Sequence, residues 1–303
     1  MKPKVIIFGI GTSFKSFLQN FNNEYEIIGL SDWDESKHGL TMGGYKIINP
    51  YKFEEHDYDY ILIVSYYVRE IQNQLKERIN LGDDKIMVPP KYMIKHGKPF
   101  EDPKTKAFAG ELIIGLTKMC DKAGITLYLD YGSLLGIVRD KNVIEWDDDI
   151  DFSINQQDAK TFNRLLLENK DNLPYSEFIN WSAICLQDDE GNLWNFSLMF
   201  QNRDKQLFNE FDIGIGVNKF YENSAVSMRM RYFSRPLIHF KNFDIIAYQG
   251  YDLKAPYRHI EYLNYLYHDW VRPKVYSFGQ KYGSGERVHM PELKTNNSEK
   301  ILF

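Results

Sequence analysis

The sequence is poor in cysteine, has no long apolar run and carries no excess of positive charge. Its two cysteines, Cys120 and Cys185, cannot build a disulfide framework, so we expect reduced, buried thiols. The longest apolar stretches, such as Val5–Ile10, are too short to cross a bilayer. Lysine and arginine number 37 against 42 aspartates and glutamates, a net charge of −5, which argues against nucleic acid as the main partner.

These absences predict a cytoplasmic protein without a transmembrane segment, which could still work at the inner face of the membrane. Lys2 and Lys4 precede an apolar run, as in a signal peptide, but Gly9 and Gly11 break that run and no cleavage site follows. Hydrophobic residues make up 43% and charged residues 26% of the chain, which is typical of a folded globular protein. A homo-oligomer is a further hypothesis.

The length of 303 residues predicts two domains, because a domain usually holds about 150 residues. A series of prolines between residues 89 and 103 interrupts the regular pattern and marks the boundary. We therefore expect a first domain over residues 1–95 and a second over residues 104–303.

Strand and helix signals alternate in the first domain. A run that is apolar throughout, such as Val5–Phe8, is typical of a strand buried on both faces. Further strands are predicted over Glu26–Leu30, Tyr60–Ser65 and Lys85–Val88, with helices over Phe14–Phe21, capped by Ser13, and over Arg69–Ile79. This alternation predicts a small parallel sheet of the α/β class, resembling a Rossmann fold.

The second domain mixes helices and strands less regularly, which favours an α+β arrangement. Helices are predicted over Lys104–Cys120, Ser133–Arg139, Gln156–Leu167 and Arg258–Tyr267. Strands are predicted over Thr126–Asp130, Asp149–Ile154, Ile179–Leu186, Leu193–Phe200 and Phe211–Val217. The last dozen residues, rich in lysine, asparagine and serine, predict a loose tail.

Asp149 and Asp151 are the strongest chemical signal in the chain. They alternate with Ile150 and Phe152, so on a strand both carboxylates point to one face while the apolar side chains enter the core. Neighbouring carboxylates repel unless a cation lies between them, and all-oxygen ligands favour Mg²⁺ or Mn²⁺ over zinc. The alternative is a solvated acidic turn, but the alternation argues for a strand that binds metal.

A tight turn lies about fifteen residues before these carboxylates. A strand ends at Asp130, Gly132-Ser133 follow, and a helix begins. The backbone N–H groups at the start of such a helix suit a phosphate, and Gly132 lets it approach closely. Alone, Gly-Ser is usually a turn and a helix cap, so its interest lies in the combination with the two carboxylates.

Together these segments resemble the LicD/fukutin family of the polymerase-β-like nucleotidyltransferase superfamily. The family pattern is a Gly-Ser or Gly-Thr turn, then Leu-Leu-Gly-x-x-Arg, then Trp-Asp-x-Asp-Ile/Val-Asp. The sequence supplies it in Gly132–Arg139 and Trp146–Asp151. Later segments, Ala255-Pro256, Tyr262-Leu263 and Tyr267–Pro273, resemble the family's ending, with His268 in place of the usual glycine. The implied fold is a nucleotidyltransferase-like mixed sheet with helices.

The resemblance implies a transferase that moves a substituted phosphate, such as phosphocholine or ribitol phosphate, from a nucleotide-activated, CDP-linked donor to a sugar hydroxyl. The acceptor would be a glycan or a lipid-linked glycan. Asp149 and Asp151 would hold Mg²⁺ or Mn²⁺ at the donor phosphates. Asp212, on a later strand, would be the third carboxylate, as metal ligand or proton acceptor.

Other residues near these motifs are candidates for contacting the substrate. Arg139 offers a planar fork for phosphate oxygens, or a salt bridge to the acidic loop. Asp147 and Asp148 are either outer ligands or solvated. The residues predicted to contact the substrate are Gly132, Ser133, Tyr131, Trp146 and Lys141.

The first domain carries part of a dinucleotide-binding fingerprint. Gly9 and Gly11 follow the first strand and Asp32 closes the second, but Phe14 occupies the position of the third glycine. The domain resembles small Rossmann-like domains of bacterial sugar-modifying enzymes. Nucleotide binding at Gly9, Gly11 and Asp32 is one hypothesis for this domain, and a scaffold or oligomerisation module is the other.

Two other functions stay open from the sequence. A metal-dependent glycosyltransferase also places Asp-x-Asp after an α/β region, but does not explain Gly132–Arg139. A non-enzymatic nucleotide-sensing module built on the first domain leaves Asp149, Asp151 and Asp212 unexplained.

Overall fold

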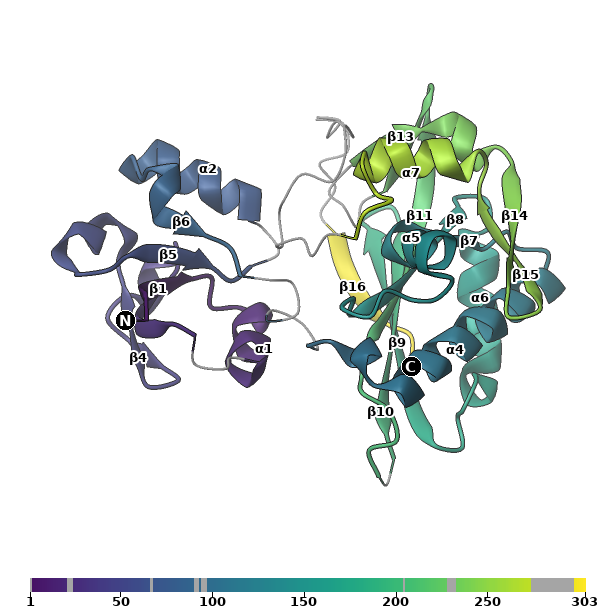
Figure 1. Cartoon of the computed structure of the whole chain (residues 1–303), viewed down its shortest axis with the longest axis horizontal. Coiled ribbons are helices and arrows are strands. Elements are labelled where there is room, and N and C mark those ends of the chain that lie inside the picture. The colour runs from purple at the N-terminus through teal and green to yellow at the C-terminus, as the bar shows by residue number, and fades with distance from the viewer. Residues whose placement is uncertain are drawn as a thin grey trace. The chain divides into compact units, whose positions relative to one another are not determined.

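The computed structural model describes residues 2–20, 24–65, 68–89, 93, 97–203, 205–227, 233–273 and 297–303 (Figure 1). The chain divides into two compact units, the first reaching Gly97 and the second beginning at Lys98. Among the described residues, none of the helices is both long enough and apolar enough to span a bilayer.

The first unit is built on a six-stranded sheet. Its strands are β1 (Lys4–Phe8), β2 (Glu26–Ser31), β3 (Thr41–Met42), β4 (Tyr45–Ile48), β5 (Tyr60–Ile63) and β6 (Ile86–Met87). They lie in the order β3-β4-β2-β1-β5-β6, and every pair is parallel except β3 with β4. The five parallel strands thus follow the order of a doubly wound nucleotide-binding fold.

Two apolar clusters cover the two faces of this sheet. Val5 and Ile7 belong to one cluster, Ile6 and Phe8 to the other, and all four are at most 2% exposed. This confirms that the first strand is buried on both faces, as its unbroken apolar run predicts. The accompanying helices are α1 (Thr12–Asn20) and α2 (Val68–Ile79).

The structure corrects two details of this unit. Ser13 does not cap α1, because the helix begins at Thr12 and Ser13 lies inside it. Strands β3 and β4, which are only two and four residues long, were not predicted from the sequence. Strands this short carry too few residues for an alternating or continuous apolar pattern.

The second unit is built on a ten-stranded mixed sheet. Eight strands follow the order β14-β15-β7-β8-β11-β10-β9-β16, while β12 pairs with β11 and β13 with β12. Their bounds are β7 (Tyr128–Leu129), β8 (Asp149–Asn155), β9 (Ile179–Asp188), β10 (Leu193–Asn202), β11 (Asp212–Tyr221), β12 (Ser224–Ser227), β13 (Phe233–Pro236), β14 (Phe243–Tyr248), β15 (Tyr251–Pro256) and β16 (Asn297–Ile301). The sheet is mixed, because β8–β11 and β7–β15 are parallel pairs and the other pairs are antiparallel.

Four α-helices accompany this sheet in the described residues (Figure 1). They are α4 (Pro103–Lys122), α5 (Tyr131–Asp140), α6 (Ala159–Asn169) and α7 (His259–Tyr267). Helix α4 shows how the sequence sets a helix start: Pro103 is its first residue and the Asp102 carboxylate accepts the Thr105 N–H at 2.9 Å. A parallel α/β unit followed by a mixed sheet with helices confirms the predicted fold class.

The predicted loose tail is wrong for the last residues. Strand β16 pairs antiparallel with β9, from Asn297 opposite Asp188 to Ile301 opposite Ile184. Leu302 and Phe303 then pack against the core of the unit. The polar composition of β16 gave no strand signal, because an edge strand with one face in solvent needs few apolar residues.

Candidate functional site

Strands β8 and β11 place the three predicted carboxylates on one face of the sheet. Ile150 and Phe152 are at most 1% exposed and belong to the core, so Asp149 and Asp151 point to the opposite face. In the parallel register Asp212 lies beside Asp149, and Gly214 lies beside Asp151. Residues paired across adjacent strands share a face of the sheet, so Asp212 joins the other two carboxylates.

A second carboxylate group overlaps this set. Single carboxylate oxygens of Asp147, Asp148 and Asp149 all lie within 4.8 Å of one another. Asp148 is 1% exposed and Asp149 5%, which corrects the interpretation of Asp148 as solvated. Asp149 therefore belongs both to this group and to the face that carries Asp151 and Asp212. A set of oxygen ligands this close fits a hard divalent cation, because the cation removes their mutual repulsion.

Helix α5 starts directly against the carboxylate strand. The Asp130 carboxylate accepts the Tyr131 N–H at 2.8 Å, and the Asp130 N–H donates to the Asp151 carbonyl at 3.0 Å. The Ser133 hydroxyl oxygen accepts the Asp151 N–H at 2.8 Å. Ser133, predicted to contact the substrate, thus also ties α5 to β8 at Asp151. Its hydroxyl hydrogen can still be donated to another group.

Two glycines of α5 let the segment that follows the helix lie close to it. A Cβ at Gly132 would lie 2.4 Å from Oδ2 of Asp147. A Cβ at Gly136 would lie 2.6 Å from the backbone carbonyl oxygen of Asn142, on the segment that leads to the acidic residues. Just before Gly132, Tyr131 holds a left-handed conformation with φ of 43°. Such strain in a non-glycine residue is typical of positions that the fold holds for a function.

Arg139 has a different partner from the one considered in the sequence. Its guanidinium donates to both carboxylate oxygens of Asp140, at 2.7 and 2.6 Å, and to the carbonyl oxygen of Trp270 at 3.4 Å. The ion pair is therefore with the next residue and not with the acidic loop, although the Arg139 guanidinium lies 5.8 Å from the ring of Trp146. A contact between Arg139 and donor phosphates stays a prediction.

The remaining predicted substrate residues lie around the same helix. Trp146 is half-buried and packs against the core. Lys141 is exposed, in a left-handed conformation at the end of α5, and its ammonium donates to the Val138 carbonyl at 3.1 Å.

A buried ionic network that was not predicted from the sequence lies beside the start of α5. Asp130 and Arg235 form a salt bridge of 2.7 Å in which both side chains are 0% exposed, and Tyr262 donates to Asp130 at 2.7 Å. These residues are 105 and 132 positions apart from Asp130 in the chain. An arginine in a short strand gives no local signal of such a partner, so only the fold reveals it.

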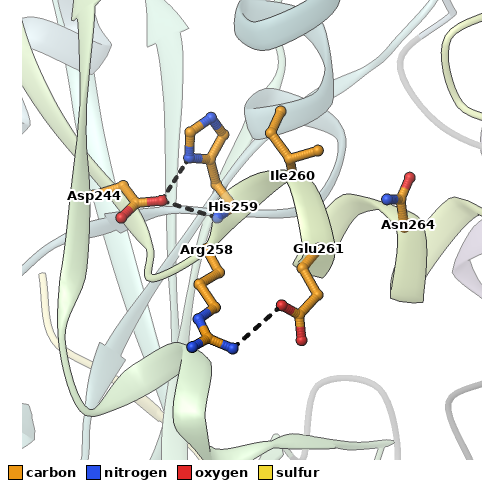
Figure 2. A pocket seen from close by; sticks show the side chains of 6 residues that line it. All are labelled: Asp244, Arg258, His259, Ile260, Glu261 and Asn264. Carbon is orange, nitrogen blue, oxygen red and sulfur yellow. Dashed lines mark hydrogen bonds and ion pairs between the residues drawn. The ribbon is translucent and has the colours of Figure 1, made fainter.

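A separate hollow of about 360 Å³ lies at the start of α7 (Figure 2). There the Asp244 carboxylate accepts the N–H of His259 at 3.0 Å and contacts its imidazole Nδ1 at 2.7 Å. Arg258 pairs with Glu261 at 3.5 Å. Burial opposes ionisation of Asp244, but the hydrogen bonds from His259 outweigh it and lower the pKa of this carboxyl. Asp244 lies on β14, three strands from β8 in the sheet order.

In the first unit, the predicted nucleotide-binding residues separate into different roles. Gly9 has a φ of +99°, and a Cβ there would lie 2.8 Å from the Val64 carbonyl oxygen, so this glycine permits the ends of β1 and β5 to approach. An added Cβ at Gly11 would meet no described atom within 4 Å. Asp32 contacts Lys37 at 3.5 Å. Nucleotide binding at these residues stays a prediction.

The carboxylate face, the turn at the start of α5 and the mixed sheet define a domain of the nucleotidyltransferase type. Comparison with known families agrees: residues 124–258 match the LicD/FKTN/FKRP nucleotidyltransferase domain, and residues 1–87 match the C2185-like N-terminal domain. The first match is to a transferase domain family, so it supports transferase activity for residues 124–258. No curated protein matches the chain.

Similar solved structures cover parts of the chain. UDP-D-quinovosamine 4-dehydrogenase from Vibrio fischeri is 21% identical, covering 30% of this chain and 80% of that one, with a TM-score of 0.24. The antibiotic-resistance factor ANT(2'')-Ia is 13% identical, covering 55% of this chain and 76% of that one, with a TM-score of 0.33. The repressor RSP of the Rex family is 10% identical, covering 40% and 63%, with a TM-score of 0.24.

Proposed function

We propose that the second unit transfers a substituted phosphate, such as phosphocholine or a polyol phosphate, from a CDP-linked donor to a sugar hydroxyl. The observation that carries this proposal is the register that sets Asp212 beside Asp149, on the face that also holds Asp151. Three carboxylates on one face, next to a helix start, suit the binding of a metal-bound diphosphate. The LicD domain match supports the same class of reaction.

The residues present fit a divalent cation. Asp149, Asp151 and Asp212 would hold it, with the Asp147 and Asp148 carboxylates close to Asp149. All of these ligands are oxygens, which favours Mg²⁺ or Mn²⁺ over zinc. The bound ion would stabilise negative charge on the donor phosphates as a Lewis acid.

The protein's own groups would orient the two substrates. The acceptor oxygen forms a bond to the donor phosphorus that carries the substituent, the pyrophosphate bond breaks, and a nucleoside monophosphate leaves. Asp212 would either accept the proton of the sugar hydroxyl or bind the metal ion as a ligand. The N–H groups of α5 around Gly132 and Ser133 would bind phosphate oxygens. Arg139 would add a further contact if its guanidinium left the Asp140 carboxylate and bound the donor phosphates instead.

A binding screen followed by product analysis tests the proposal. CDP-, UDP- and GDP-linked compounds are added with Mg²⁺, and the true donor should raise the midpoint of thermal unfolding, because it binds the folded state. Transfer to a glycan or a lipid-linked glycan should then release the nucleoside monophosphate. Release of a nucleoside diphosphate would instead indicate a glycosyltransferase and overturn the proposal.

Metal removal is the second arm of this experiment. Turnover should stop in excess EDTA and return with Mg²⁺ or Mn²⁺ but less well with zinc. Full activity in the chelator would contradict the assignment of the carboxylates as metal ligands.

A further inference from the structure

A fully buried network surrounds the Asp130 carboxylate at the start of α5. Arg235 donates to Oδ2 of Asp130 at 2.7 Å, while Oδ1 accepts the hydroxyl of Tyr262 at 2.7 Å and the N–H of Tyr131 at 2.8 Å. Arg235 also donates to the Tyr262 oxygen at 2.9 Å. Burial raises the pKa of Tyr262 well above its usual range, so its hydroxyl keeps the hydrogen that it donates.

The network connects the start of α5 with four further elements of the second unit. Arg235 comes from β13 and Tyr262 from α7, and the second terminal nitrogen of Arg235 donates to the side-chain oxygen of Asn218 on β11. Asn218 in turn donates to Asn155 on β8 at 3.3 Å. The guanidinium lies 4.5 Å from the ring of Phe240. Asp130 is thereby fixed relative to both carboxylate strands.

Stability alone does not account for a buried ion pair of this kind. Well-packed apolar side chains of similar size are often as stable or more so, because the charges need not be removed from water. The Nε atom of Arg235 is buried without a hydrogen-bond partner among the described residues, a further cost. Buried networks of this type are best explained by the geometry that they impose.

We propose that Arg235 and Tyr262 are positioning residues of the transferase site. They fix Asp130, Asp130 fixes the first N–H of α5, and the Ser133 hydroxyl on that helix accepts the Asp151 N–H. The network thus sets the position of Gly132 and Ser133, which would face the donor phosphates, relative to Asp149 and Asp151 on β8. The kinetic part of this inference rests on the proposed function, whereas the structural part does not.

Tyr262→Phe tests the network, with Tyr265→Phe as the matched control. Tyr265 is on the same helix, and its hydroxyl donates to the Ser234 carbonyl at 2.9 Å, so the control loses a bond to the same strand β13 without touching Asp130. Urea unfolding first verifies that both variants fold. Hydrogen exchange of the Asp151 amide is then measured by NMR on the full chain, without metal or donor.

In Tyr262→Phe we expect the Asp151 amide to exchange about tenfold faster or more, and Tyr265→Phe to leave this rate close to that of the wild type. With donor and Mg²⁺, the single-turnover rate should fall by a similar factor in Tyr262→Phe, while the donor KM stays within about threefold. Equal exchange and equal rates in the two variants would overturn the inference.

Arg235→Lys serves as a second variant if Tyr262→Phe unfolds. It keeps the charge beside Asp130 but loses the planar fork, so it cannot bind Asp130, Tyr262 and Asn218 together. The Asp151 amide should again exchange faster, and an unchanged exchange rate would overturn the inference. If no donor is turned over by the wild type, the proposed function fails, whereas the exchange measurement still decides on the network.

Discussion

Asp149 and Asp212 lie side by side on the parallel strands β8 and β11, although 63 residues separate them in the chain. Two carboxylates in adjacent positions on one face concentrate negative charge, which suits a divalent cation with oxygen ligands. The same face carries Asp151 two residues further along β8. The pairing therefore predicts that removing the charge of either Asp149 or Asp212 lowers the activity.

Asp149→Asn and Asp212→Asn should each lower the single-turnover rate with Mg²⁺ by at least about 100-fold, because a neutral amide is a poor metal ligand and proton acceptor. Rapid-quench kinetics measures this rate, and urea unfolding verifies that each variant folds. Asp189→Asn, at an exposed position, is the control and should leave the rate unchanged. Near-normal rates in both site variants would contradict the assignment.

The hydroxyl of Ser133 can be tested by a pair of substitutions. Ser133→Ala removes the acceptor of the Asp151 N–H and should lower the single-turnover rate by about tenfold or more. Ser133→Thr keeps the hydroxyl and should retain most of the activity, in line with the Gly-Thr variant of the family turn. The comparison isolates the hydroxyl from the size of the side chain. Equal loss of activity in both variants would indicate that the hydroxyl itself is not needed.

Gly136→Ala should destabilise the second unit, against the usual trend. In most helix interiors this change stabilises by up to about 1 kcal/mol. Here the new methyl would lie 2.6 Å from the Asn142 carbonyl oxygen and 3.0 Å from the Ile144 backbone nitrogen, so the backbone must move. We expect a net loss of about 1–3 kcal/mol in urea unfolding. Gly11→Ala, where the methyl meets no described atom within 4 Å, should cost little by the same measurement.

The sequence predicted strand β8, which carries Asp149 and Asp151, because its signal is local. Asp149, Ile150, Asp151 and Phe152 alternate in the chain, and alternation alone assigns each side chain to a face. The Asp212 strand was predicted from the sequence too, and the family resemblance assigned Asp212 as the third carboxylate, but the place of this strand beside β8 came only from the structure. Register between distant strands depends on long-range packing, which one sequence does not reveal.

Features that depend on distant partners could not be predicted. Nothing near Arg235 indicates that its partner is Asp130, 105 residues away. The burial of Asp148 and the pairing of Arg139 with Asp140 depend on the path of the loop between α5 and β8. The β14–β15 hairpin turns at Gln249 and Gly250, which both have positive φ. The glycine at this turn is the one local sign of the hairpin in the sequence.

The Asp244 carboxyl predicts a pH-dependent contribution to stability. Its pKa is lowered in the folded state by the hydrogen bonds from His259, which outweigh burial. The contribution should thus be complete above the unfolded pKa of about 3.9 and disappear as the pH falls through the lower folded value. Asp244→Asn should cost about 0.5–2 kcal/mol at pH 7, the range of a helix cap. The difference from wild type should shrink in urea titrations near pH 3, whereas the exposed control Asp252→Asn should show little difference at either pH.

The C-terminal strand predicts that the end of the chain is needed for stability. Deleting residues 297–303 removes the pairing of β16 with β9, including the bonds from Leu302 N–H to the Ala183 carbonyl at 2.8 Å and from Ala183 N–H to the Phe303 carbonyl at 3.0 Å. We expect a loss of about 1–3 kcal/mol, because the lost hydrogen bonds and apolar contacts exceed the chain entropy regained. The bared edge of β9 should also promote aggregation.

Two point variants show how much of this loss comes from the packing of side chains at the end of the chain. Phe303→Ala should account for part of the loss, because Phe303 packs against the core, whereas Ile301→Ser, at a side chain 77% exposed, should change the free energy of unfolding by less than about 0.5 kcal/mol. Urea unfolding and light scattering at rising protein concentration measure the two effects. A deletion variant as stable and as soluble as the full chain would show that the last residues form a loose tail, as their composition alone suggests.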